Sequence, residues 1–158
     1  TASNPLTVSL ATPPAAFTDH VDFGDTASEA AHAVAASPSS GTSIEAGLTR
    51  RYSGVTSPGS YFEFTGDVTP GKAFILRAVE TYDRAQIKDY DISVNGTKVA
   101  TRVYERTDGG QGTATYQILI PDDGTLTSTG KVTIRMTYSG TSGRYDPSIA
   151  DAWLIAAP

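Results

Sequence analysis

The chain contains no cysteine. Disulfides, thiolate metal sites and cysteine nucleophiles are therefore excluded. The absence does not indicate a reducing compartment, because a chain of 158 residues can bury about 70% of its unfolded surface without a covalent cross-link. The length predicts one domain over residues 1–158.

Basic charge and long apolar runs are also scarce. The chain has 12 Lys and Arg residues against 17 Asp and Glu, for a formal net charge of −5. The basic residues are scattered, with Arg50-Arg51 as the only adjacent pair, whereas a nucleic-acid-binding surface normally shows a basic patch. No apolar run approaches the roughly 18 residues of a membrane span. We therefore expect neither nucleic acid nor a membrane as a partner.

Catalytic signatures are sparse as well. The only histidines are His20 and His32, both near the amino end, and no Gly-x-Ser-x-Gly motif occurs. A hydrolytic triad would have to use one of these two histidines. Paired carboxylates could perform glycoside hydrolysis, but among 17 acidic residues some pair always exists, so the signal has no specificity. The sequence predicts a protein that is not an enzyme.

What the sequence does contain is alternation of apolar and polar residues. In the segment Lys88–Arg102 this alternation puts apolar and polar side chains on opposite faces of two short strands. Asn95-Gly96 lies between them, and both residue types tolerate the positive φ that a two-residue type I′ turn requires. The segment is therefore predicted to be a β-hairpin.

Similar patterns predict strands in most of the remaining chain. We expect them at Leu6–Ala11, Leu48–Ser53, Ser60–Asp67, Ala73–Thr81, Ala114–Ile120, Lys131–Ser139 and Ile149–Ala156. Leu6–Ala11 could instead be a linker from a parent chain. Asp19–Ala36 is interpreted as a loop carrying acidic groups, followed by a strand near His32–Ala36; its Ala-rich half could alternatively form a short helix. Ser37–Gly47 is rich in Ser, Gly and Pro and is predicted to be a loop.

About eight or nine short strands separated by turn signals are typical of an all-β, antiparallel β-sandwich of the jelly-roll type. The chain begins at Thr1, without methionine or a signal peptide, which suggests a mature protein or a domain taken from a longer one. The abundance of Thr, Ser, Gly and Tyr is typical of a secreted, extracellular β domain.

Acidic residues near both ends of the chain form a candidate calcium site. Hard cations bind carboxylate and carbonyl oxygens in loops. Asp22, Asp25 and Glu29 lie close together before an early strand, and Asp151 lies in the last strand. The terminal strands of a jelly roll often pair, which would bring these groups together. Alternatively, Asp151 simply points outward from an alternating strand.

Loop tyrosines with charged neighbours are candidates for ligand binding. Sugar rings stack on aromatic rings, while Arg and Asp can form paired hydrogen bonds to adjacent hydroxyls. Tyr52 is one such residue, and the residues favoured most are Tyr82, Asp83, Arg84, Tyr104, Arg144 and Tyr145. The alternative for each tyrosine is that its ring caps the core and its hydroxyl faces water. Trp153 is expected in the core.

The order of these features resembles two families. The strands within 60–156 resemble the succession in galactose-binding-like jelly-roll carbohydrate-binding modules. In addition, Ser28-Glu29-x-x-His32, then Arg51, then Tyr61-Phe62-Glu63-Phe64 resembles the β-sandwich domain carboxy-terminal to the catalytic barrel of bacterial β-L-arabinofuranosidase-like glycoside hydrolases. By this resemblance, Glu29 and Asp151 match positions that bind a structural calcium ion, although the doubled acidic motif of those modules is not obvious here.

The resemblance implies a non-catalytic carbohydrate-binding module of a secreted glycoside hydrolase. Its partner would be an arabinose-, galactose- or xylose-containing glycan of plant or microbial origin, and the module would be a monomer tethered to a catalytic domain. The alternative is a structural accessory domain that packs on the catalytic domain and binds no ligand of its own; a large exposed apolar patch would favour it. A third class, an independent hydrolase, would need a deep pocket with a perturbed carboxylate or histidine.

Overall fold

A computed structural model describes residues 13–158 of the chain. The strand predicted at Leu6–Ala11 lies outside these residues. Within them the elements follow the order β1 (Asp19–Asp22), α1 (Thr26–Ala31), β2 (Ala35–Ala36), β3 (Gly41–Glu45), β4 (Leu48–Tyr52), β5 (Tyr61–Asp67), β6 (Phe74–Tyr82), β7 (Gln86–Val94), β8 (Thr97–Arg106), β9 (Gly112–Ile120), β10 (Lys131–Tyr138) and β11 (Ser148–Ala156).

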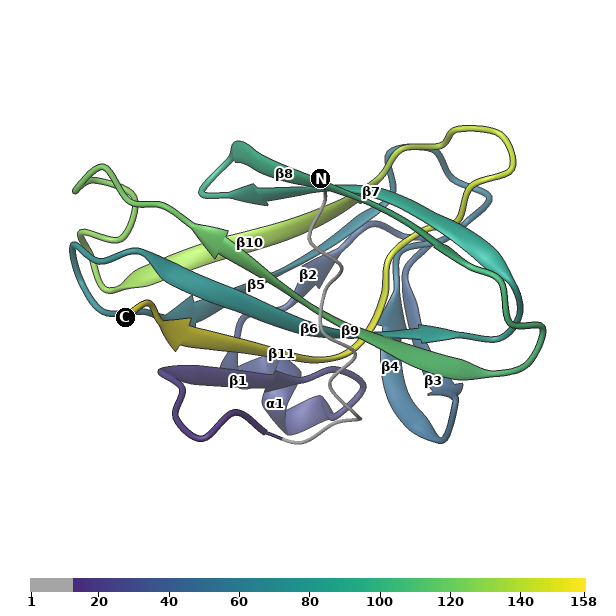
Figure 1. Cartoon of the computed structure of the whole chain (residues 1–158), viewed down its shortest axis with the longest axis horizontal. Coiled ribbons are helices and arrows are strands. Elements are labelled where there is room, and N and C mark those ends of the chain that lie inside the picture. The colour runs from purple at the N-terminus through teal and green to yellow at the C-terminus, as the bar shows by residue number, and fades with distance from the viewer. Residues whose placement is uncertain (1–12) are drawn as a thin grey trace.

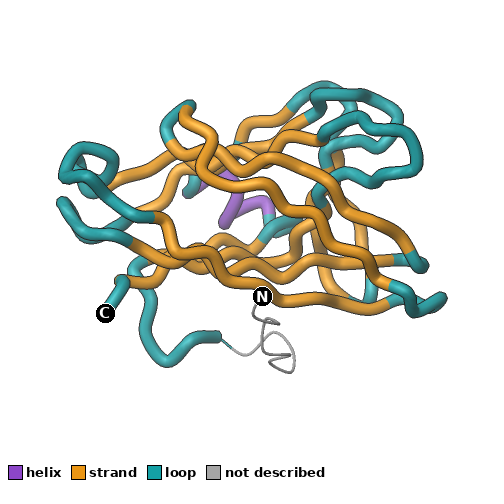
Figure 2. Tube along the Cα trace, turned by 45° about the horizontal axis from the view of Figure 1, so that its top comes forward, coloured by secondary structure: helices purple, strands orange, loops and turns teal. Residues whose placement is uncertain are grey.

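The strands form two antiparallel sheets that face each other (Figures 1 and 2). The first sheet has the order β3-β4-β11-β6-β9, and β1 pairs with the part of β11 that β4 leaves free. The second sheet has the order β2-β5-β10-β7-β8. The predicted all-β antiparallel sandwich is thus confirmed. None of the helices in residues 13–158 is long and apolar enough to span a membrane.

The core lies between the sheets, where the alternating apolar residues meet. Phe62 and Phe64 of β5 point inward and are almost completely buried, as are Ile134 and Met136 of β10. Their polar neighbours along each strand face outward. Burial of this kind stabilises by about 25 cal/mol per Å² of apolar surface, so the period of two fixes which face of each strand is internal.

The predicted hairpin is confirmed and is longer than expected. β7 and β8 pair over nearly their whole length, with one register shift between Ile92 and Ser93. Asn95 has φ 50° and Gly96 has φ 83°, as a type I′ turn requires. The Asn95 side chain adds two hydrogen bonds, donating to the Leu126 carbonyl and accepting from the Thr133 N–H.

The interpretation of Asp19–Ala36 was wrong in part. Its first residues form strand β1 rather than a loop, and its Ala-rich half is helix α1, the alternative that the sequence left open. The strand expected near His32–Ala36 is present as β2, limited to Ala35–Ala36. Capping explains the helix better than alanine content does. The Asp25 carboxylate accepts a hydrogen bond from the Ser28 N–H at 2.7 Å, which satisfies one of the free donors at the helix start.

Ser37–Gly47 was also misassigned, because it contains strand β3. β3 pairs with β4 through a tight turn at Ala46-Gly47, where both residues have positive φ. Alanine is uncommon in that conformation, so the turn was hard to recognise. With β1 and β3, neither of which was expected, the described residues contain eleven strands rather than about eight or nine.

Candidate functional site

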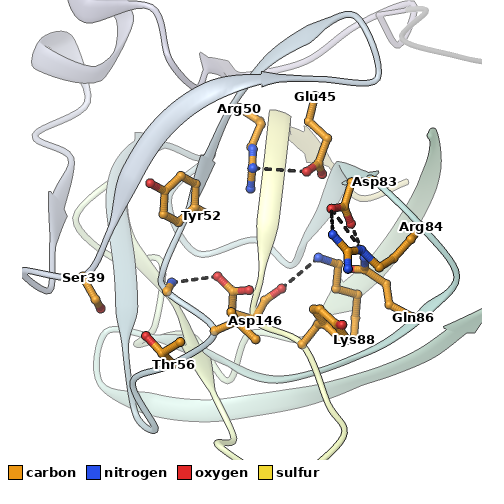
Figure 3. Close-up of a pocket in the computed structure, with 13 residues that line it drawn as sticks. Ser39, Glu45, Arg50, Tyr52, Thr56, Asp83, Arg84, Gln86, Lys88 and Asp146 are labelled. Atoms are coloured by element: carbon orange, nitrogen blue, oxygen red, sulfur yellow. Dashed lines mark hydrogen bonds and ion pairs between the residues drawn. The ribbon is translucent and has the colours of Figure 1, made fainter. Parts of the chain in front are cut away.

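A pocket of about 480 Å³ opens at one end of the sandwich (Figure 3). Four parts of the chain form its walls: the β3–β4 hairpin, the loop after β4, the β6–β7 connection and the segment before β11. Its charged lining residues are Glu45, Arg50, Asp83, Arg84, Lys88 and Asp146. The pocket therefore exists because distant segments of the chain converge at the end of the sheets.

Backbone hydrogen bonds hold these walls in place. The Asp146 carboxylate accepts hydrogen bonds from the N–H groups of Ser53, at 3.1 Å, and Gly54, at 2.7 Å. The adjacent residue Tyr145 exchanges backbone hydrogen bonds with β7, donating to the Ile87 carbonyl and accepting from the Asp89 N–H. The segment before β11 is thus fixed to both sheets, and the pocket is preformed.

One wall carries an ion pair and a tyrosine. The Arg50 guanidinium lies 3.1 Å from the Glu45 carboxylate and donates to the Ser148 hydroxyl at 3.1 Å. It also lies over the Tyr52 ring, 4.5 Å from the centroid. Both Arg50 and Tyr52 come from the same face of β4, two residues apart. The contacts restrict the guanidinium to one orientation beside a half-buried aromatic ring.

The opposite wall contains a buried lysine. Lys88 is 2% exposed, and its ammonium donates to the Asp146 backbone carbonyl at 3.0 Å. Within residues 13–158 it forms no ion pair with a carboxylate, although an ammonium can donate three hydrogen bonds. Burial lowers the pKa of Lys88, and the surrounding carboxylates act in the opposite direction. The pocket thus holds a cation whose hydrogen-bonding capacity is not fully used by the protein.

The rim of the pocket is formed by Asp83, Arg84 and Gln86. The Asp83 carboxylate accepts from the Arg84 guanidinium at 2.8 Å and from the Gln86 amide at 2.9 Å. The hydrogen bond from Arg84 lowers the pKa of Asp83, so this carboxylate is ionised at neutral pH. Rim and walls together present fixed donors and acceptors beside two tyrosines, which is the chemistry that a polyol ligand requires.

Solved structures share this architecture at low sequence identity. A family 35 carbohydrate-binding module from Clostridium thermocellum matches 88% of this chain and 99% of its own length, with a TM-score of 0.59 and 14% identity. An exo-β-1,3-galactanase from Phanerochaete chrysosporium matches 88% of this chain through 29% of its own, with a TM-score of 0.55 and 10% identity. A GH26-CBM35 β-(1,4)-mannanase from Podospora anserina matches 89% of this chain through 28% of its own, with a TM-score of 0.55 and 15% identity.

The fold is that of family 35 carbohydrate-binding modules. The predicted likeness to jelly-roll carbohydrate-binding modules is therefore confirmed at the level of fold. No protein-family model matches the sequence, and no curated protein sequence matches it. At these identities the similarity shows the architecture alone.

Three of the predicted ligand-binding residues lie together in this jelly-roll pocket. Asp83, Arg84 and Tyr145 all line it, although they come from segments about 60 positions apart in the sequence. Arg144, the neighbour of Tyr145, does not line the pocket. Its backbone carbonyl accepts a hydrogen bond from the Tyr138 hydroxyl, which fixes the turn that presents Tyr145.

Tyr82 and Tyr104 belong to the interior rather than to a binding surface. Tyr82 has no exposed surface, and its hydroxyl donates to Glu80 at 2.8 Å. Tyr104 is half-buried and packs edge-to-face on Tyr82, with the ring centroids 6.2 Å apart. Both side chains point inward, because each lies on the internal face of its strand. The Tyr82 ring is not accessible for stacking, and the Tyr104 ring is engaged by Tyr82 and by the Arg102 guanidinium, 4.4 Å from its centroid, so the structure places both tyrosines in the interior network rather than in the pocket.

The two tyrosines belong to a buried polar network behind the pocket. Glu80 is fully buried and accepts hydrogen bonds from Tyr82, Tyr90 and the Arg102 guanidinium. Burial and the adjacent Glu80 carboxylate raise the pKa of Tyr90, so the phenol stays protonated and can donate. The network is fully hydrogen-bonded at its centre, as a buried charge must be to avoid a large desolvation penalty.

Glu29 and Asp151 do not form a shared set of calcium ligands in this structure. The Arg51 guanidinium binds Glu29 through two hydrogen bonds, of 2.7 and 2.8 Å. His20 binds Asp151 at 2.8 Å. Among residues 13–158, no group of three or more His, Cys, Asp or Glu side chains is arranged to hold a metal ion. Side chains of the protein itself therefore occupy both carboxylates, and calcium binding stays a prediction.

The same interactions explain the Ser28-Glu29-x-x-His32 motif. The Ser28 hydroxyl accepts from the Asp22 N–H, and Glu29 binds Arg51. The His32 ring contacts two acceptors, the Ser28 carbonyl at 2.7 Å and the Asp19 carboxylate at 2.9 Å. Both ring nitrogens must be protonated to donate to both acceptors. The motif thus attaches α1 and β1 to the sandwich, and we call its ion pairs (Glu29–Arg51, His32–Asp19, His20–Asp151) the polar seam.

The sequence reasoning did not select Lys88, the most buried charged residue of the pocket, or the half-buried Arg50 as binding residues. A signal for Lys88 was present, since it lies two residues before Tyr90 and four before Ile92 and therefore on the apolar face of β7. A charged residue at an inward position indicates either a buried network or a binding site. Arg50 had no comparable signal, because the pattern of β4 is short and polar.

Proposed function

We propose that this chain is a non-catalytic carbohydrate-binding module of a secreted glycoside hydrolase and that the pocket at the end of the sandwich binds the glycan. The observation that carries the proposal is the combination of the incompletely hydrogen-bonded Lys88 ammonium with the fixed groups of Arg50, Asp83 and Arg84 beside Tyr52 and Tyr145. Such a site binds hydroxyls by charge-assisted hydrogen bonds and the sugar ring by contact with the tyrosines.

The fold and the carboxylates support a binding role rather than catalysis. Each carboxylate lining the pocket already accepts hydrogen bonds from the chain: Glu45 pairs with Arg50, Asp83 with Arg84, and Asp146 with two backbone N–H groups. The hydrogen bond from Arg84 lowers the pKa of Asp83, whereas a general acid in glycoside hydrolysis needs a carboxyl group with a raised pKa. The matching sandwich parts of the galactanase and the mannanase support attachment to a glycoside hydrolase.

The test is affinity electrophoresis of the 158-residue chain in gels containing arabinan, galactan or xylan, with calcium and with EDTA. We expect retardation by at least one glycan, and we expect Tyr145→Ala to weaken it clearly. Arg144→Ala is the matched control, because this neighbouring residue lies outside the pocket and should leave the retardation unchanged. Equal retardation of Tyr145→Ala and the wild type would exclude this pocket. Loss of retardation in EDTA alone would support the calcium prediction.

One observation favours the alternative of a structural accessory domain. Leu119 of β9, Ile75 of β6 and Ile155 of β11 are register partners on the outer face of the first sheet. Leu119 is 61% exposed, so the row presents apolar surface to solvent. Failure of every glycan to retard the wild-type protein would favour this alternative over the binding module.

A further inference from the structure

A second hollow lies on the outer face of the second sheet and shares no lining residue with the first pocket. Its volume is about 400 Å³. Neighbouring strands β5, β10 and β7 form its floor, and the turn of the β7–β8 hairpin lies at one side. The lining residues are Glu63, Ser93, Gly96, Thr133, Arg135 and Thr137. Among residues 13–158, no apolar side chain lines this hollow, which we call the sheet groove.

Arg135 lies at the centre of the sheet groove in a fixed orientation. Its Nε donates to the Glu63 carboxylate at 2.8 Å, directly across the β5–β10 pair. Its guanidinium lies over the Tyr61 ring, 3.8 Å from the centroid. Within residues 13–158, the one hydrogen bond of this side chain uses Nε. The two terminal amino groups therefore remain available as a paired donor, which is the geometry that adjacent hydroxyls accept.

Hydroxyl groups surround this guanidinium. Thr133 and Thr137 flank Arg135 on the same face of β10, because they lie two residues before and after it. Ser93 opposes Arg135 on β7. Each hydroxyl can donate one hydrogen bond and accept others, so the floor offers both kinds of partner on three adjacent strands.

The charges in the sheet groove indicate a neutral ligand. Its one cation, Arg135, is paired with its one anion, Glu63. An ionic ligand would therefore meet no uncompensated opposite charge. Apolar side chains of a peptide would meet polar and charged side chains in the described lining. The floor is a sheet face rather than an edge, so strand addition is also excluded. A neutral chain rich in hydroxyls needs neither an uncompensated charge nor apolar side chains in the groove, and it therefore fits this lining.

We propose that the sheet groove is a second carbohydrate site, which binds an internal stretch of a neutral, extended polysaccharide. Arg135 and Glu63 bind vicinal hydroxyls, and Ser93, Thr133 and Thr137 bind the neighbouring hydroxyls along the chain. The site acts independently of the first pocket. The protein would then hold one polysaccharide at two places, which raises the apparent affinity for polymers over short oligosaccharides.

The test compares variants in a Lys88→Met background, which removes the main cation of the first pocket. Affinity electrophoresis in arabinan, galactan and xylan measures the association constant of each variant. Thr133→Trp fills the sheet groove, and Arg135→Lys keeps the charge but removes the paired donor. Both should lower the association constant about tenfold, because hydrogen bonds to a charged group are lost. Thr101→Trp is the matched control, since Thr101 is exposed on β8 of the same sheet outside the groove.

Two results would overturn the proposal. The first is that adding Thr133→Trp or Arg135→Lys to the Lys88→Met protein leaves its retardation unchanged in every glycan. The other is no retardation of the Lys88→Met protein in any glycan; if the wild type is retarded, this result leaves the first pocket as the site of binding. Thermal unfolding checks that each variant is folded. If Thr133→Trp does not fold, Arg135→Lys decides the question, because it changes no buried volume.

Discussion

The polar seam and the end pocket are both rich in charge, but they use it differently. In the polar seam, each carboxylate has an arginine or histidine side chain of the protein as its partner, as in the bidentate Glu29–Arg51 pair. In the pocket, Lys88 is as buried as the core yet has only a backbone carbonyl as its hydrogen-bond partner among the described residues. Residue type alone does not show whether a charged side chain stabilises the fold or binds a ligand. The number of its hydrogen-bond partners within the protein does distinguish the two roles.

The largest expected effect concerns the polar seam and the free energy of unfolding. Arg51→Ala removes both hydrogen bonds to Glu29, whose side chain is 14% exposed. Within the part of the chain that the structure describes, Glu29 would keep only the Gly24 N–H as a donor, at 3.2 Å, and a carboxylate left without its cation at such a site should reduce stability by about 3 kcal/mol. Urea unfolding measures the change. Arg84→Ala is the matched control: it removes the partner of the exposed Asp83, and we expect no measurable change. Similar losses for both variants would contradict the contrast between the two regions.

In the pocket, we expect Lys88→Met to weaken glycan binding without lowering the stability of the protein. Glycan affinity should fall at least about tenfold, because a charge-assisted hydrogen bond is lost. Stability should be unchanged or higher, since methionine removes the desolvation cost of a buried ammonium. Affinity electrophoresis and urea unfolding measure the two quantities on one preparation. A large loss of stability would instead assign Lys88 a structural role like that of Arg51.

We expect a smaller effect from the charge of His32 in the polar seam, which should make the stability of the protein depend on pH. Burial opposes the charged form of His32, but its hydrogen bonds to Asp19 and the Ser28 carbonyl raise its pKa above the ordinary 6.5. Its contribution is therefore complete below pH 6.5 and is lost as pH rises through the folded-state pKa. The pKa of Asp19 is lowered from 3.8 despite burial, so its contribution is present above pH 3.8 and is lost on acidification.

His32→Gln tests this pH window. The variant should be about 1 kcal/mol less stable than the wild type near pH 5.5, and the difference should shrink above neutral pH. Urea unfolding at several pH values measures it. A difference that grows with rising pH would show that His32 is neutral in the folded protein.

The smallest expected effect concerns the orientation of Tyr52. A Cβ added at Gly41 would lie 2.5 Å from the Tyr52 hydroxyl oxygen and 2.9 Å from Cζ. The tyrosine must therefore move in Gly41→Ala, whereas the backbone of β3 accepts alanine without a positive φ. Glycan affinity should weaken a few-fold with little change in unfolding. Unchanged affinity would show that the orientation of Tyr52 is not critical for binding.

The strands of the core were predictable because their side chains obey a period of two. Phe62 and Phe64 in β5, and Ile134 and Met136 in β10, show which face is internal without any knowledge of the partner strand. The elements that were misassigned are held by other forces. α1 depends on the cap at Asp25, and β3 depends on a turn with Ala46 at positive φ. Such local contacts leave little trace in the hydrophobic pattern.

The site was partly predictable for a related reason. Asp83, Arg84 and Tyr145 carry suitable chemistry in loops, where ligands usually bind. Tyr82 has the same chemistry and a neighbouring position, but the register of β6 turns it inward to Glu80. A difference of one residue in a strand exchanges the two faces. Arg50 and Lys88 could be assigned to the pocket only once the convergence of the four wall segments was known.

The pairing of β1 with β11 has a consequence for the order of the elements along the chain. The Thr18 N–H donates to the Leu154 carbonyl at 2.7 Å, so the beginning of β1 and the end of β11 lie side by side (Figure 1). A short linker between these positions, with new ends opened in the exposed loop 107–111, would give a circular permutant. Every strand pair would be retained, and the pocket would remain intact near the beginning of β11.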